Sequence, residues 1–135
     1  MNRIYMDNAA TTRVTEPVFE AMKPYFCEKF GNPMSVHSFG RESRRAVEEA
    51  RRQVAAALNA DSREIYFTGC GTESDNWALR GAAYAKGNTR RTLVTTTIEH
   101  HAILHTAEQL EKEGFKVVYV PVDEFGIVKL DEMER

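Results

Sequence analysis

The amino-acid sequence predicts an α/β fold in which a mostly parallel sheet is flanked by helices. Two observations support this class. Segments of strand character alternate with segments of helical periodicity through the second half of the chain, an order that favours parallel strands joined by helical connections. Hydrophobic residues make up 42% of the 135 residues, which is enough to form one core.

The first part of the chain is expected to form two helices separated by an irregular segment. The first helix is expected to begin at Thr15-Glu16-Pro17, because proline suits the first helical turn, and to end at Gly31-Asn32-Pro33. Residues 34–40 mix polar and aromatic types and are expected to be irregular. The second helix is expected to run from Arg41 to about Asn59.

The second of these helices has a distinct apolar and a distinct charged face. Its charged run is interpreted as a solvated surface on which Glu48 and Arg52 have the favourable four-residue spacing. The residues expected to point inward are Ala46, Val47, Ala50, Val54, Ala57 and Leu58.

Strands and helices then alternate to the end of the chain. The helix after residue 73 is expected to stop at Gly87-Asn88, and the next one at Gly114, because glycine and asparagine favour helix ends. A helical pattern that starts at Leu130 and Met133 stops at Arg135, which suggests that the chain is a fragment. The expected elements are, in order, strand 64–68, helix 73–86, strand 92–97, helix 101–113 and strand 116–121.

The most informative segment is the glycine turn between Thr68 and the following helix. Gly69 and Gly71 permit a sharp turn and close approach of a ligand, and Thr72 with Asp75 has the spacing of a capping pair. Free amides and the positive end of the helix dipole would then face one point, which suits a phosphate. The segment fits neither a Walker loop nor a dinucleotide fingerprint, and an ordinary strand-to-helix connection remains the alternative.

Two segments are expected to face a common pocket. In open parallel sheets, ligands bind beyond the carboxyl ends of the strands. The glycine turn follows one expected strand, and Ile98-Glu99-His100 follows the next. From the residues alone, His100 is interpreted as a surface or capping residue.

Composition excludes several classes of partner. The formal net charge of −2 argues against binding to nucleic acid or to a membrane surface through bulk electrostatics. The chain has no apolar run long enough for a signal peptide or a membrane span, so a cytoplasmic location is the default expectation. Cys27 and Cys70 form no C-x-x-C pair; Cys27 is expected to pack as a small apolar residue and Cys70 to be a spectator. His101 and His105 have a helical spacing that suits a metal, but no third ligand is evident, so no metal site is expected.

Four motifs, in order and spacing, resemble those of cysteine desulfurases of the NifS/IscS type. These enzymes belong to the class-V aminotransferase family and depend on pyridoxal 5'-phosphate (PLP) with fold type I. The chain is similar to their amino-terminal third. The matching segments are Tyr5 to Thr12, Gly31-Asn32-Pro33 with His37 to Gly40, Gly71 to Asn76, and Glu99-His100.

The resemblance implies roles for three residues of this chain. Gly71 and Thr72 resemble the residues that hold the cofactor phosphate through backbone amides and a hydroxyl. His100 resembles the histidine that stacks on the pyridine ring and assists proton transfer, a role that suits imidazole because its pKa lies near physiological pH. Residues 1–15 resemble an amino-terminal arm, and residues 16–135 the amino-terminal portion of the large PLP-binding domain. Cys70 departs from the glycine or serine expected there.

The resemblance also implies what lies outside this chain. The family's aldimine lysine stands in a Ser-x-His-Lys motif, which does not occur in the 135 residues. The aspartate that partners the pyridine nitrogen and the mobile-loop cysteine that receives sulfur are expected outside as well. This chain is therefore expected to be inactive alone and to require the rest of the enzyme or a complementary chain.

For the parent protein, the implied reaction releases sulfur from L-cysteine as an enzyme persulfide, with alanine as co-product. The sulfur would then pass to iron-sulfur cluster assembly or another sulfur-transfer pathway through an acceptor or scaffold protein, and the enzyme is expected to be a homodimer. Three alternatives remain: a related PLP enzyme such as a selenocysteine lyase, a non-catalytic binding module, and a truncated product without an independent role.

Overall fold

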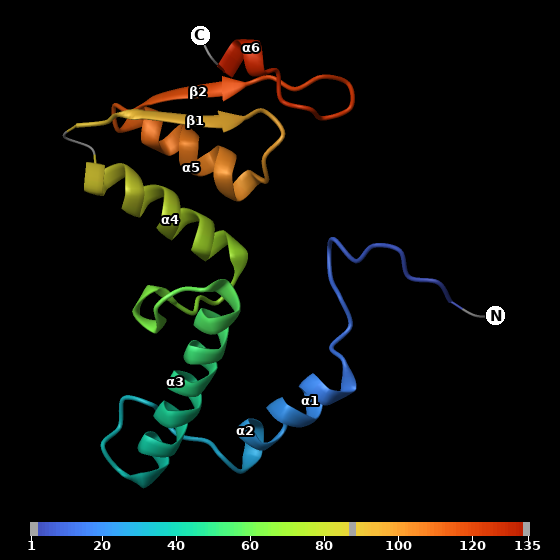
Figure 1. The fold of residues 1–135 in the computed structure, drawn as a ribbon, viewed down its shortest axis with the longest axis vertical. Helices are drawn as coiled ribbons and strands as arrows, with labels where there is room; N and C mark the ends of the chain where they lie inside the picture. Colours follow the sequence, from blue (N-terminus) through green and yellow to red (C-terminus); the bar gives the residue numbers. More distant parts are fainter. Residues whose placement is uncertain (1–2, 87–88, 134–135) are drawn as a thin grey trace. The chain divides into compact units, whose positions relative to one another are not determined.

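The computed structural model describes residues 3–86 and 89–133, and it divides the chain into two compact units. The first unit is Met1–Tyr66 and the second is Phe67–Arg135. Figure 1 labels the α-helices and strands of both units as they are named below. None of the helices in the described part of the chain combines the length and apolar character that a membrane crossing needs.

The first unit begins with two short helices instead of the single one predicted. Helix α1 spans Glu16–Met22 and α2 spans Pro24–Cys27. Pro24 has no amide hydrogen to donate to the preceding turn, so the hydrogen-bond ladder is interrupted after α1. Pro17 lies in the first turn of α1, as its position in the sequence predicts.

Helix α3 spans Ser38–Leu58 and begins earlier than the predicted start at Arg41. His37 caps it, because its Nδ1 accepts a hydrogen bond of 3.4 Å from the amide of Gly40. A Cβ atom at Gly40 would collide with the carbonyl oxygen of Ser35, so this close approach requires glycine. The helix ends at Asn59, which adopts the left-handed conformation with φ of 52°.

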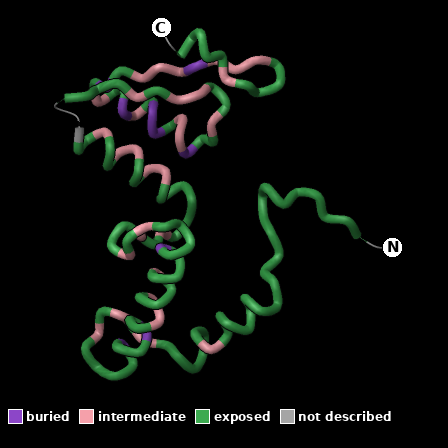
Figure 2. Tube along the Cα trace, viewed as in Figure 1, coloured by how far each residue is buried: buried purple, intermediate pink, exposed green. Residues whose placement is uncertain are grey.

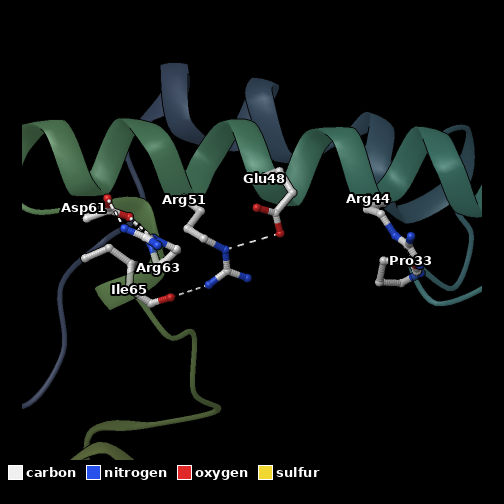
Figure 3. A network of polar contacts seen from close by, with 7 residues as sticks. All are labelled: Pro33, Arg44, Glu48, Arg51, Asp61, Arg63 and Ile65. Carbon is white, nitrogen blue, oxygen red and sulfur yellow. Dashed lines mark hydrogen bonds and ion pairs between the residues drawn. The ribbon is translucent and has the colours of Figure 1, made fainter.

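Charged side chains of α3 hold neighbouring segments as well as facing solvent (Figure 3). Arg51 pairs with Glu48 at 3.3 Å and also donates to the carbonyl oxygen of Ile65. Arg44 donates from Nε to the carbonyl oxygen of Pro33 at 2.8 Å. The interpretation of the charged side of α3 as a solvated face is therefore incomplete, since two of its arginines form hydrogen bonds with the segments on either side of the helix.

The pairing and the apolar face of α3 also differ from expectation. Arg52 pairs with Glu49 at 2.6 Å, three residues away, rather than with Glu48. Of the residues predicted to point inward, four are exposed in this unit: Ala50, Val54, Ala57 and Leu58. Amphipathic periodicity identifies the apolar side of a helix, but burial requires a partner that covers it.

The predicted strand at 64–68 is absent, which is a correction to the sequence interpretation. Ser62–Glu64 forms a short 3-10 helix, η1, capped by Asp61. Among the described residues, the sheet contains β1 and β2 alone, so residues 64–68 take no part in it. Aromatic and branched residues favour a strand. A strand forms, however, only when a neighbouring backbone segment exchanges hydrogen bonds with it.

The second unit contains the α/β arrangement that the sequence predicts. Strand β1 (Thr92–Thr96) pairs in parallel with β2 (Lys116–Val120), in a register that aligns Thr92 with Lys116. Helix α4 spans Gly71–Lys86, α5 spans His101–Lys112 and α6 spans Leu130–Met133. The two strands, both long helices and the parallel pairing are confirmed. The stop signal at Gly87-Asn88 lies outside the described residues.

The core of this unit lies where α5 meets β2, and α4 packs against α5. Figure 2 shows buried positions on both α5 and β2. Gly114 adopts φ of 88° directly after α5, which allows the chain to turn into β2. The buried apolar residues are Ala102, Ala107, Leu110, Phe115 and Val120.

Candidate functional site

The glycine turn leads directly into α4, but Thr72 does not cap the helix. Because α4 begins at Gly71, Thr72 is its second residue, and the predicted capping pair with Asp75 is wrong. Glu73 holds the turn instead, since its Oε2 accepts a hydrogen bond of 2.7 Å from the amide of Gly69. The hydroxyl groups of Thr68 and Ser74 lie 2.5 Å apart and brace the same turn.

The start of α4 presents several hydrogen-bond donors. The first amides of a helix have no acceptor within the helix. No described residue accepts from the amide of Gly71, Thr72 or Glu73, or from the exposed hydroxyl of Thr72. A Cβ atom built on Gly71 would meet nothing within 4 Å, so there is open space beside these donors. An anion with several acceptor oxygens fits this position, and the helix dipole favours its charge.

His100 lies at the start of α5 and caps that helix. Its Nδ1 accepts a hydrogen bond of 3.1 Å from the amide of Ala102, which confirms the interpretation of His100 as a capping residue. Because Nδ1 accepts, the proton of the neutral imidazole is on Nε2, and Nε2 is the nitrogen left for other partners. The preceding residue is held too, since Glu99 accepts from the hydroxyl of Thr96 at 2.9 Å.

The structure brings Thr72 and His100 to the same pocket, as expected, although the strand expected before the glycine turn is absent. The pocket has a volume of about 510 Å³, within the range of small-molecule sites. It lies between the part of α4 from Thr72 to Arg80 and the part of the chain from His100 to Gln109, and Gly71 precedes the lining residue Thr72 in the chain. The other lining residues are Asn76, Arg80, His101, Ala102, His105, Thr106 and Gln109.

Among the lining residues without a role predicted from the sequence, three join α4 to α5. Asn76 and Thr106 form a hydrogen bond of 2.7 Å that joins α4 to α5. Arg80 pairs with Glu113 at 3.6 Å and joins the two helices further from the turn. One signal was present: Asn76 stands four residues after Thr72, and Arg80 four after Asn76, so all three lie on one face of the helix.

Glu113 interacts with side chains of both α4 and α5. It accepts hydrogen bonds from the hydroxyl of Tyr84 and from Gln109, the latter at 3.0 Å. The Tyr84 hydrogen bond is the main cause that holds the pKa of Glu113 below its ordinary value of 4.5, and the same bond raises the pKa of Tyr84. The charged form of Glu113 is therefore the one that the folded state favours.

This shift predicts a pH-dependent contribution to stability. Since the folded-state pKa of Glu113 is lowered, its contribution is present above its ordinary pKa and is lost as the pH falls through the folded-state value. We expect the difference in melting temperature between the wild type and Glu113→Gln to be larger at about pH 6 than at about pH 3. Glu124→Gln, at an exposed position, is the matched control. Equal differences at both pH values would contradict this assignment.

Both cysteines are exposed, so the expected packing of Cys27 is wrong in this unit. Cys27 ends α2, a helix without buried residues. Cys70 lies in the turn before α4. His101 and His105 stack with ring centroids 5.3 Å apart on the exposed side of α5.

A family model identifies the class to which the chain belongs, and the fold agrees with it. A parallel α/β unit carries a donor-rich helix start and an imidazole on one pocket, which α4 and α5 line. The family model described as aminotransferase class-V matches residues 4–135. The chain belongs to the class-V aminotransferase family.

The similar proteins within this family are named cysteine desulfurases. One is "Cysteine desulfurase IscS" of Clostridium botulinum, 53% identical over all of this chain and 34% of its own length. Another, of Methanosarcina thermophila, carries the same name and is 52% identical over 98% of this chain and 33% of its own. The chain thus spans about a third of the length of the curated relatives it matches.

Solved structures agree with the fold. A structure titled "NIFS-LIKE PROTEIN" superimposes with a TM-score of 0.91 and 49% identity, over 98% of this chain and 36% of that one. A second, titled "SspA in complex with cysteine", gives a TM-score of 0.75 and 38% identity, over 82% of this chain and 32% of that one. The expected fold class, an α/β fragment of the fold of NifS-like enzymes, is therefore confirmed.

Proposed function

We propose that the complete protein containing this chain is a PLP-dependent cysteine desulfurase. Its reaction would convert L-cysteine and an enzyme thiol into alanine and an enzyme persulfide. The observation that carries the proposal is the meeting of Thr72 and His100 on one pocket whose helix start offers uncommitted amides. The printed names of the relatives supply the substrate class.

The residues present suit the phosphate of PLP. The amides of Gly71 and Thr72 and the hydroxyl of Thr72 offer three donors, and a doubly charged phosphate accepts several bonds at a helix start. The amide of Gly69 is already bound to Glu73, so it is not part of the proposed cradle. When bound, PLP supplies the electron sink that stabilises negative charge at the substrate carbon.

His100 is proposed to lie against the cofactor ring and to move protons. Its cap bond fixes the ring at Nδ1 and leaves Nε2 as the atom that can exchange a proton with the substrate. A histidine held in one orientation is a better proton-transfer group than a freely rotating one, because less ordering is needed when the reaction occurs.

The remaining parts of the site are assigned to the rest of the complete protein. No Ser-x-His-Lys segment occurs in these 135 residues, so the lysine that binds the cofactor covalently is proposed to lie elsewhere. The same holds for the cysteine that receives the sulfur. Residues 1–15 are proposed to form an arm and residues 16–135 the start of the large domain.

Exposed apolar side chains support the proposal that this chain has further partners. Val94 on β1 is 48% exposed and Trp77 on α4 is 53% exposed, although both belong to elements of the α/β unit. Additional elements of the enzyme, together with a second copy in a homodimer, would cover such residues. A sulfur-acceptor protein is proposed as a further partner.

The experiment that tests the function is a titration of the complete protein with PLP, followed by L-cysteine. The proposal predicts tight PLP binding and the release of one alanine for each sulfur transferred. Selenocysteine as the preferred substrate would favour a selenocysteine lyase. A protein that binds no PLP but associates with a desulfurase would contradict the proposal and indicate a binding module.

A further inference from the structure

We infer that Asn76 and Thr106 are positioning residues that hold the proposed phosphate-binding turn and His100 at a fixed separation. This inference rests on the proposed function. Neither side chain has an assigned role in the proposed cofactor contacts or proton transfer. Both line the pocket that Thr72 and His100 share.

The first hydrogen bond that connects the two parts of the site lies within α4. The side-chain amide of Asn76 donates from Nδ2 to the carbonyl oxygen of Thr72 at 2.9 Å. A carbonyl oxygen can only accept, so this bond fixes the orientation of the Asn76 amide: Nδ2 faces Thr72, and Oδ1 must face the opposite way.

The second link crosses from α4 to α5. The hydroxyl of Thr106 lies 2.7 Å from Asn76 Oδ1 and donates to it. Thr106 is 3% exposed and Asn76 is half-buried, so water competes little for this bond. If the hydroxyl of Thr106 were lost, Asn76 Oδ1 would lose its partner on α5, and leaving such an acceptor unpaired costs more than the net value of an ordinary hydrogen bond.

The third link continues to His100. The hydroxyl of Thr106 also lies 2.8 Å from the carbonyl oxygen of Ala102, while the amide of Ala102 donates to His100 Nδ1 at 3.1 Å. The single hydroxyl proton of Thr106 can serve one acceptor at a time, and both acceptors lie beside the site. Thr106 therefore lies within hydrogen-bond distance of Asn76, which holds Thr72, and of Ala102, which holds His100.

The geometry explains why such a connection is needed. Asn76 lies one helical turn after Thr72, and Thr106 lies one turn after Ala102, so the pair joins the two helices at the wall of the pocket. Helix ends fray, so without such a connection the first turns of α4 and α5 would be less fixed than the middle of either helix. A slide of α4 along α5 would separate the phosphate donors from the imidazole, and misplacement by about 1 Å can reduce catalysis about 100-fold.

The test uses Thr106→Val in the complete protein, with Thr106→Ser as the matched control. Valine keeps the shape of threonine and removes the hydroxyl, whereas serine keeps the hydroxyl. We expect Thr106→Val to raise the dissociation constant for PLP by about 3- to 10-fold, the loss of one hydrogen bond. Thr106→Ser should stay within about twofold of the wild type. Asn76→Leu, at a half-buried position, provides a second variant with the same expected direction.

A double variant separates positioning from general stability. If Thr106 acts through Thr72, then Thr72→Val combined with Thr106→Val should weaken PLP binding by less than the product of the two single effects. A purely structural role would lower the melting temperature of the PLP-free protein and leave PLP binding unchanged below that temperature.

The outcomes distinguish this inference from the function on which it rests. If the wild type binds no PLP, both fail. If the wild type binds PLP and Thr72→Val weakens it, the inference alone is overturned by either of two results. One is an unchanged dissociation constant in both Thr106→Val and Asn76→Leu. The other is a double variant whose effect equals the product of the single effects.

Discussion

Replacing Thr72 with valine is expected to weaken PLP binding by about 10- to 140-fold. A hydrogen bond to a charged group contributes about 1.5 to 3 kcal/mol, and each 1.4 kcal/mol corresponds to about a tenfold change in affinity. Valine has nearly the shape and helix propensity of threonine, so α4 should begin as before. The measurement is the equilibrium dissociation constant of the complete protein for PLP, followed by its visible absorbance.

Thr72→Ser is the matched control for this prediction. Serine retains a hydroxyl at the second residue of α4, so its PLP affinity should remain close to that of the wild type. Asp75→Asn controls for changes in charge near the turn without touching the proposed donors. An affinity for PLP that is the same in Thr72→Val as in the wild type would contradict the role of Thr72.

Replacing His100 with alanine is expected to leave the protein coloured by PLP but slow. Proton transfer by a positioned side chain contributes about 10²- to 10⁴-fold, so turnover of L-cysteine should fall by that factor. The cofactor phosphate would still be held at α4. The measurements are bound PLP per protein and the rate of alanine release.

The capping role of His100 must be separated from its proposed chemical role. Alanine also removes the bond from the Ala102 amide, and loss of a helix cap costs about 0.5 to 2 kcal/mol of stability. His100→Asn keeps a side-chain acceptor at the cap and has no group that exchanges protons near neutral pH. We expect His100→Asn to retain the melting temperature of the wild type and to be as slow as His100→Ala. Full turnover in His100→Asn would refute the proton-transfer role.

The parts of the fold that the sequence predicts are those whose pattern is local. Leu110 and Ala107 repeat at helical spacing and are buried in α5, and Gly114 ends the helix where its conformation requires glycine. The strand expected at 64–68 failed for a different reason. Its residues have strand character, but pairing depends on a second segment that no local pattern specifies.

Some features of the candidate site could likewise be predicted from the sequence, and others could not. Thr72 and His100 line one pocket as expected, but the reason differs: no strand precedes the glycine turn among the described residues, and the pocket is lined by α4 and α5 instead of by strand ends. The cap itself could not be predicted correctly: Thr72 is the expected cap of α4, whereas Glu73 holds the turn. The bond between Asn76 and Thr106 depends on how two helices pack, which spacing within either helix does not reveal.

The most direct test of the central claim is a crystal structure of the complete protein with PLP bound. We expect the cofactor phosphate to lie within hydrogen-bond distance of the Gly71 and Thr72 amides and the Thr72 hydroxyl. We also expect the imidazole of His100 to lie against the pyridine ring, with Nδ1 still accepting from Ala102. A phosphate bound away from the start of α4, or an imidazole turned away from the ring, would contradict the account.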